Sequence, residues 1–87
     1  METYIKETID DLELMYCTIK KYDNNSEFLF EIELADNMEI DRLIESLTAY
    51  KLSVSILSNV IKIPRKHFTT QENFQQLVNC FRLCVSF

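Results

Sequence analysis

The sequence of 87 residues contains no glycine, and this absence restricts both its backbone turns and its chemistry. A chain of this length and average composition would carry about six glycines. Phosphate-binding loops, dinucleotide fingerprints and the G-x-S-x-G nucleophile elbow need glycine where the backbone turns tightly or approaches a ligand. The sequence therefore excludes these nucleotide-binding and hydrolase motifs.

Size and composition predict one domain that spans residues 1–87. The chain is 47% hydrophobic and 26% charged, which is typical of a folded protein. The segment 1–12 carries four acidic residues, unlike the basic start of a signal peptide. No apolar run approaches the roughly 18 residues of a membrane span. We therefore expect a cytoplasmic protein without membrane contact.

The cysteine spacing argues against a disulfide framework. Cys17, Cys80 and Cys84 are odd in number, and the last two lie one helical turn apart. Their Cβ atoms would be about 5–6 Å apart on a helix, whereas a disulfide needs about 3.5–4.5 Å. We expect three reduced thiols, as in a cytosol.

An amphipathic helix is predicted for residues 38–50. Asp36 as the N-cap, with Glu39 three residues later, is typical of a capping box. The apolar residues recur at the spacing of one helical face: Ile40, Leu43, Ile44 and Leu47.

A second helix is predicted from about residue 70 towards the C-terminus. Thr69 is the expected N-cap, and Glu72 lies at the third helical position. An apolar stripe that should pack on a sheet follows this helix: Phe74, Leu77, Val78, Phe81 and Cys84.

Strands are predicted for residues 27–34 and 54–63. In the second region Ser58-Asn59 separates two apolar runs, which predicts a tight hairpin. Pro64 ends this hairpin because proline has no N–H for the ladder. In the first region, alternation with period two places four apolar residues on one face: Phe28, Phe30, Ile32 and Leu34.

Residues 1–22 fit two patterns. A helical stripe continues through this segment, but residues 16–22 and 27–34 also resemble two strands around the turn-forming residues 23–26. We favour a short helix through about Asp10, followed by a strand. The predicted fold is α+β with two layers: an antiparallel sheet of three to four strands covered by two helices. It is built as strand–strand–helix twice, with a short N-terminal helix.

Acidic residues concentrate in the first half of the chain. Residues 1–45 hold thirteen of the fourteen acids, and residues 46–87 hold five of the nine lysines and arginines. Rows of carboxylates can imitate the dense charge of a phosphate backbone. A solvated acidic face is the competing interpretation. Six carboxylates are the expected docking surface for a larger protein with a basic surface: Glu27, Glu31, Glu33, Glu39, Asp41 and Glu45.

The second half contains a small basic segment at the exit of the predicted hairpin. Nucleic-acid readers combine a basic stripe with aromatic rings, and loops often carry binding groups. The acidic balance of the chain makes nucleic acid the less favoured partner. The candidates for contact with DNA or RNA are Lys62, Arg65, Lys66 and His67.

No catalytic or metal site is predicted. His67 is the only histidine, and no local pattern pairs it with a nucleophile or an orienting carboxylate. Together with the three cysteines it would supply four zinc ligands, but the spacing matches no zinc motif. We expect a non-enzymatic protein without a cofactor or a metal.

Five of the last seven residues of the chain are apolar. Leu83 and Phe87 lie on a flank of the predicted helix, away from its main stripe. Chain ends are commonly polar or frayed. The two side chains are therefore candidates for self-association into a homodimer, and a second buried face is the competing interpretation.

These features predict a small protein-binding module that inhibits a larger nucleic-acid-binding protein or enzyme. Residues with AT-rich codons, such as Asn, Ile and Lys, far outnumber Gly, Ala, Arg and Pro. This bias and the absence of catalytic motifs favour a viral protein, such as a phage or mobile-element accessory protein that acts in the host cytoplasm. The alternatives are a DNA- or RNA-binding regulator that uses residues 62–68, and a homodimeric structural subunit.

Overall fold

The computed structural model describes residues 1–36 and 38–85 and has the predicted α+β fold. The predicted hairpin around Ser58-Asn59 is confirmed as the last two strands. The elements in chain order are α1 (Glu2–Leu14), β1 (Thr18–Lys21), β2 (Phe28–Glu33), α2 (Ile40–Ala49), β3 (Ser55–Leu57), β4 (Val60–Pro64), the 3-10 turn η1 (Arg65–His67) and α3 (Gln71–Arg82).

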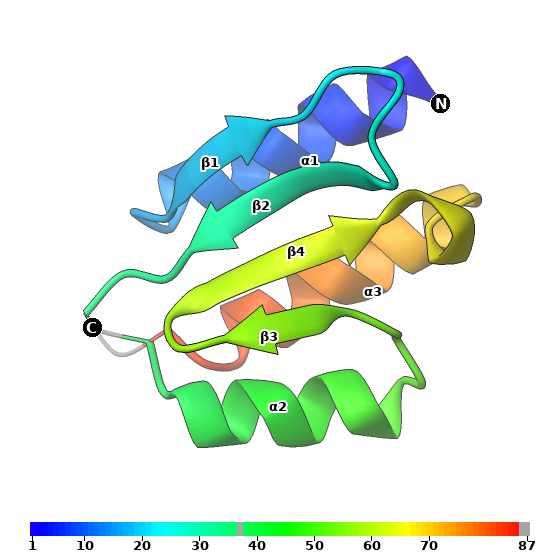
Figure 1. The fold of residues 1–87 in the computed structure, drawn as a ribbon. Coiled ribbons are helices and arrows are strands. Elements are labelled where there is room, and N and C mark those ends of the chain that lie inside the picture. The colour runs from blue at the N-terminus through cyan, green and yellow to red at the C-terminus, as the bar shows by residue number, and fades with distance from the viewer. Residues whose placement is uncertain (37, 86–87) are drawn as a thin grey trace.

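The four strands form one antiparallel sheet in the order β1-β2-β4-β3. Helices α1 and α3 lie behind the sheet in Figure 1, and α2 lies next to α3 beyond the β3 edge. No helix of the described chain covers the opposite face of the sheet (Figure 1). The molecule therefore has two layers and one open sheet face.

The N-terminal helix is longer than predicted. α1 extends to Leu14, whereas the sequence favoured a helix through about Asp10. Leu12 is fully buried and α1 packs on α3, so tertiary contacts extend the helix. Tyr16 then reverses the chain, and the following strand begins only at Thr18. The N-terminal helix α1 therefore covers the sheet together with α3, and α2 packs beside α3.

The start of α2 also differs from the prediction. The N-cap is Glu39, without a side-chain hydrogen bond, and the predicted cap Asp36 lies before the helix. Met38 forms a β-bridge with Val85, and the N–H of Glu39 donates to the carbonyl of Cys84. Because this pairing keeps residues 38–39 extended, the helix cannot begin where the capping pattern suggested.

The N-cap of α3 lies one residue later than predicted. Thr70, and not Thr69, accepts a hydrogen bond from the backbone N–H of Asn73 at 3.2 Å. Asn73 Oδ1 accepts from the N–H of Thr70 at 3.3 Å, which completes a capping box. Asn73 therefore takes the role that the sequence assigned to Glu72.

A β-bulge in β2 changes which side chains face the open side. Phe28 pairs with Pro64 and Phe30 pairs with Ile63, so Leu29 is an extra residue in β2. Leu29 and Phe30 are both buried. The predicted inward alternation is therefore wrong for Phe28, which the bulge turns to the open face.

One apolar core fills the space between the two layers. The predicted α3 stripe is confirmed, because its aromatic and aliphatic residues are buried along the whole helix. Strands β2 and β4 contribute the facing side chains. The fully buried large residues include Phe30, Ile32, Ile61, Ile63, Phe68, Phe74, Leu77 and Phe81.

Two helices end in Schellman motifs built without glycine. After α1, Tyr16 has a φ of 65°, and the N–H of Cys17 donates to the carbonyl of Leu12. After α2, Lys51 has a φ of 58°, and the N–H of Leu52 donates to the carbonyl of Leu47 at 2.9 Å. Both residues occupy a left-handed position where a side chain is unfavourable.

This geometry predicts opposite effects of glycine at two neighbouring positions. Lys51→Gly should stabilise the protein by about 0.5–1 kcal/mol, because glycine adopts positive φ without steric cost. Ala49→Gly, at the last residue of α2, should destabilise it by about 0.5–1 kcal/mol. Urea unfolding followed by circular dichroism measures both. If both variants change the free energy of unfolding in the same direction, the Schellman motif at Lys51 is contradicted.

The core assignment predicts the effect of truncating Phe81. Phe81→Ala should lower the free energy of unfolding by about 3–5 kcal/mol, because it leaves a cavity between the layers. Leu83→Ala serves as the control, since Leu83 is 53% exposed. Its effect on urea unfolding should stay within about 0.5 kcal/mol.

Candidate nucleic-acid interface

Two aromatic rings lie side by side on the open face of the sheet. Tyr22 follows β1, and Phe28 begins β2 where the bulge turns it outward. Their ring centroids are 6.0 Å apart, and the ring planes are inclined by 44°. Both residues are half-buried, so part of each remains accessible. We refer to Tyr22 and Phe28 as the aromatic platform.

Two lysines hold their ammonium groups over the aromatic platform. Lys20 Nζ lies 5.6 Å from the centroid of the Tyr22 ring. Lys62 Nζ lies 6.0 Å from the same centroid and 5.4 Å from that of Phe28. At these distances the ring quadrupoles attract the cations. Neither lysine forms an ion pair with a carboxylate within the described residues.

Glu31 lies on the open face between these two lysines. It is the register partner of Lys20 on β1 and of Lys62 on β4. The hydroxyl of Tyr22 donates a hydrogen bond to Glu31 Oε1. This hydrogen bond raises the pKa of Tyr22, with further contributions from desolvation and from the charge of Glu31. Tyr22 therefore stays neutral near pH 7 and is tethered at its hydroxyl.

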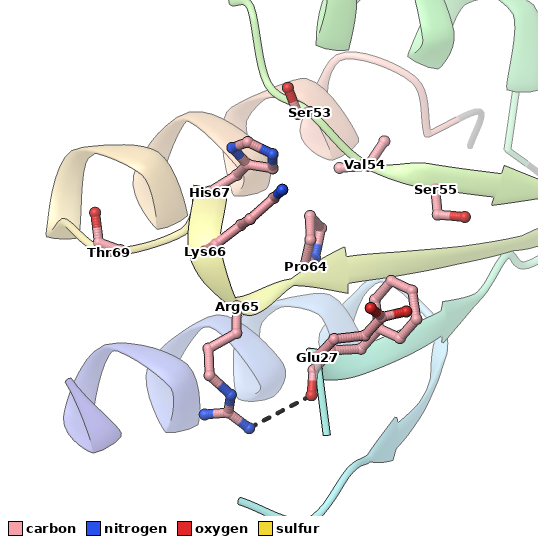
Figure 2. A pocket seen from close by; sticks show the side chains of 10 residues that line it. Glu27, Ser53, Val54, Ser55, Pro64, Arg65, Lys66, His67 and Thr69 are labelled. Carbon is pink, nitrogen blue, oxygen red and sulfur yellow. Dashed lines mark hydrogen bonds between the residues drawn. The ribbon is translucent and has the colours of Figure 1, made fainter. Parts of the chain in front are cut away.

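A hollow of about 740 Å³ adjoins the aromatic platform at the end of β4 (Figure 2). Lys66 and His67 point from η1 across this hollow towards Ser53 and Val54 (Figure 2). A second hollow of about 450 Å³ lies over the sheet. Phe28 lines both hollows, so they meet at the aromatic platform.

Arg65 is part of the basic segment, but its side chain has a structural role. Nε donates to the carbonyl of Ser26 at 3.1 Å, and Nη2 donates to the carbonyl of Asp23 at 3.1 Å and to that of Phe28 at 3.5 Å. The backbone N–H of Arg65 donates to the carbonyl of Glu27 at 2.8 Å. Arg65 therefore clamps the turn 23–28, which joins the two halves of the aromatic platform.

The predicted basic segment is thus divided between two roles. Lys62 lies on the open face, and Lys66 and His67 are exposed at the hollow. In Figure 2 the side chain of Arg65 points away from Lys66 and His67. Three of the four predicted contact residues therefore reach one connected surface.

The six predicted acidic residues lie in three separate places. Glu31 and Glu33 are on the open face, and Glu27 lines the hollow. Asp41 and Glu45 are exposed on α2, preceded by the N-cap Glu39, which pairs with Arg42 at 3.4 Å. The carboxylates therefore do not form one continuous row. Docking of a basic partner on any of these groups remains a prediction.

The candidates for self-association lie at the C-terminal end. Leu83 is the C-cap of α3 and is exposed, away from the buried stripe of that helix. Phe87 lies outside the described residues. A homodimer contact through these side chains remains a prediction.

Sequence reasoning missed three residues of this surface: Lys20, Tyr22 and Phe28. Lys20 and Tyr22 are two residues apart, so the alternation of a strand puts them on one face, and this signal was readable. The position of Phe28 was not readable, because it depends on the bulge opposite Pro64.

The cysteines are buried and do not gather into a metal site. Burial raises the pKa of all three thiols, and that of Cys80 to about 11. Within residues 1–36 and 38–85, no three His, Cys, Asp or Glu side chains are placed to hold a metal ion. No helix in the described chain has the length and apolar character needed to cross a membrane.

Comparison of the chain with protein-family models, curated proteins and solved structures finds no match.

The clamp predicts that Arg65 is needed for stability and Lys66 is not. Arg65→Ala should lower the free energy of unfolding by about 1.5–3 kcal/mol, because it removes charge-assisted hydrogen bonds to carbonyls of the turn. Lys66→Ala removes the same charge from an exposed site and should change it by less than about 0.5 kcal/mol. Urea unfolding compares the two. Equal effects would refute a structural role for the guanidinium.

Proposed function

We propose that this protein binds single-stranded nucleic acid on the open face of its sheet. The observation that supports this proposal is the aromatic platform with Lys20 and Lys62 beside it. Antiparallel sheets that present aromatic rings are a recurring surface for unpaired bases, which stack on the rings. Stacking tolerates any base, because every base has a π-face.

The lysines would supply the electrostatic part of the binding. In the free protein, the ammonium groups of Lys20 and Lys62 lie over the rings. A base that stacks on the aromatic platform takes this place, and the flexible side chains can then swing to the phosphates. Lys66, with His67 beside it, extends the cationic surface along the hollow at the end of β4.

The acidic balance of the chain is compatible with this surface. Helices α1, α2 and α3 carry eight of the fourteen acidic side chains; α1 and α3 lie behind the sheet and α2 lies beyond its β3 edge, so none of the three lies on the open face (Figure 1). Their repulsion of a phosphate chain is screened beyond about 8 Å at physiological ionic strength. Binding should therefore depend on the local cations and not on the net charge of −5.

The exposed carboxylates of α2 support a second proposal. Asp41 and Glu45 lie one helical turn apart and form no ion pair within the described residues. They could dock on a basic surface of a larger protein, as an inhibitor from a phage or another mobile element would. This proposal lacks the aromatic anchors of the open face, and we favour it less.

Oligonucleotide binding tests the main proposal. We expect labelled single strands of about 12 nucleotides, DNA or RNA, to bind in fluorescence anisotropy at low salt. Tyr22→Ala and Phe28→Ala should each weaken binding by about 1–3 kcal/mol, because each removes a stacking ring. Lys62→Ala should reduce the slope of log K against log salt by about 0.7, because one phosphate contact is lost.

Two matched variants control for the change of residue type. Tyr50→Ala removes a tyrosine at the end of α2, and Lys6→Ala removes a lysine on α1 that pairs with Asp10. Both lie outside the open face and should leave the affinity unchanged. The proposal is overturned if the wild type binds no single strand at low salt, or if the control variants weaken binding as much as Tyr22→Ala.

A further inference from the structure

Glu31 is a carboxylate in the middle of a surface proposed to bind polyanions. A negative charge at this position works against phosphate binding, so a purely electrostatic surface would not place one there. We infer that Glu31 selects guanine among the bases that stack on the aromatic platform. This inference rests on the proposed function and names the base that the same site prefers.

The position of Glu31 places its acceptors beside the stacking rings. Tyr22 donates its hydroxyl hydrogen to Oε1 of Glu31, which keeps the carboxylate next to the ring. No other hydrogen bond reaches this carboxylate from the described residues. A carboxylate has about four acceptor sites on its two oxygens, so it can accept further hydrogens from a ligand.

Guanine is the base whose edge fits these acceptors. Its Watson–Crick edge presents two adjacent N–H donors, N1–H and N2–H, which match the two oxygens of one carboxylate. Uracil and thymine present a single N–H between two carbonyl oxygens, which the carboxylate repels. Cytosine and adenine place their amino group beside a ring nitrogen that is itself an acceptor. Only guanine therefore offers a two-point contact, the geometry that gives strong discrimination between bases.

The lysines make this contact compatible with a phosphate chain. Lys20 and Lys62 flank Glu31 in the register of the sheet, one on each neighbouring strand. A phosphate near this surface therefore experiences two positive charges and one negative charge, which together attract it. The carboxylate forms hydrogen bonds only with the edge of the base that contacts it. Glu31 thus determines which base is bound, and the lysines determine how strongly the chain is bound.

Glu33 provides a matched control on the same strand and face. It lies two residues further along β2 and is exposed. Its register partners are Thr18 and Val60, neither of which is aromatic. Glu33→Gln removes the same charge from β2 as Glu31→Gln does, but away from the aromatic platform.

The test compares alternating single strands of dT with dG, dC or dA in anisotropy titrations. We expect the wild type to bind the dT/dG strand about tenfold more tightly than the dT/dC strand. Glu31→Gln should reduce this ratio below about threefold, because the amide offers one acceptor and adds a donor that clashes with N1–H or N2–H. Glu33→Gln should keep the wild-type ratio.

The outcomes separate this inference from the proposed function. If the wild type binds all strands equally, or if Glu31→Gln keeps the preference, the role of Glu31 is refuted while single-strand binding stands. If no strand binds at low salt, both are refuted. A loss of affinity without a change in the ratio identifies Glu31 as a structural residue and also overturns the inference. Circular dichroism checks that the variants are folded.

Discussion

The hydrogen bonds of Arg65 to the turn 23–28 organise the surface on which the proposed function depends. The turn connects β1 to β2, and its carbonyls would otherwise need water as their partner. By donating to three of them, the guanidinium fixes where β1 ends and where β2 begins. Tyr22 and Phe28 lie at these two ends, so the clamp also sets the spacing of their rings. The bulge opposite Pro64 then turns Phe28 outward.

The sheet is covered by helices on one face only in the described part of the chain. Helices α1 and α3 cover one face of the four-stranded sheet, α2 packs beside α3, and no helix of residues 1–36 and 38–85 lies on the other face. The uncovered face is neither fully polar nor fully apolar. Instead, the lysines form cation–π contacts with the rings, and the hydroxyl of Tyr22 donates a hydrogen bond to Glu31. These contacts stabilise the face in water, and the proposed ligand would replace them.

In a chain without glycine, turns that need a positive φ are formed by residues with a side chain, and this costs free energy. Tyr16, Lys51 and Ser58 all have positive φ, the first two at helix ends and the third in the hairpin of β3 and β4. Each such residue costs on the order of 1 kcal/mol or more. The Schellman hydrogen bonds and the buried side chains of Leu12 and Leu47 offset this cost at the two helix ends. The fold therefore tolerates the absence of glycine because tertiary packing determines these turns.

The sequence by itself determined the α+β class, the α3 stripe and the β3–β4 hairpin, because periodicity reports burial on one face and Ser58-Asn59 is a local turn signal. It did not determine the length of α1, which packs on α3 and buries Leu12 beyond the predicted end at Asp10. It also did not determine the start of α2, which depends on the β-bridge between Met38 and the distant residue Val85. For the site, the positions of Lys62, Lys66 and His67 were predictable from their sequence neighbourhood. The roles of Arg65 and Phe28 were decided only by tertiary structure, because a hydrogen bond across almost forty residues and a bulge between two distant strands leave no local pattern.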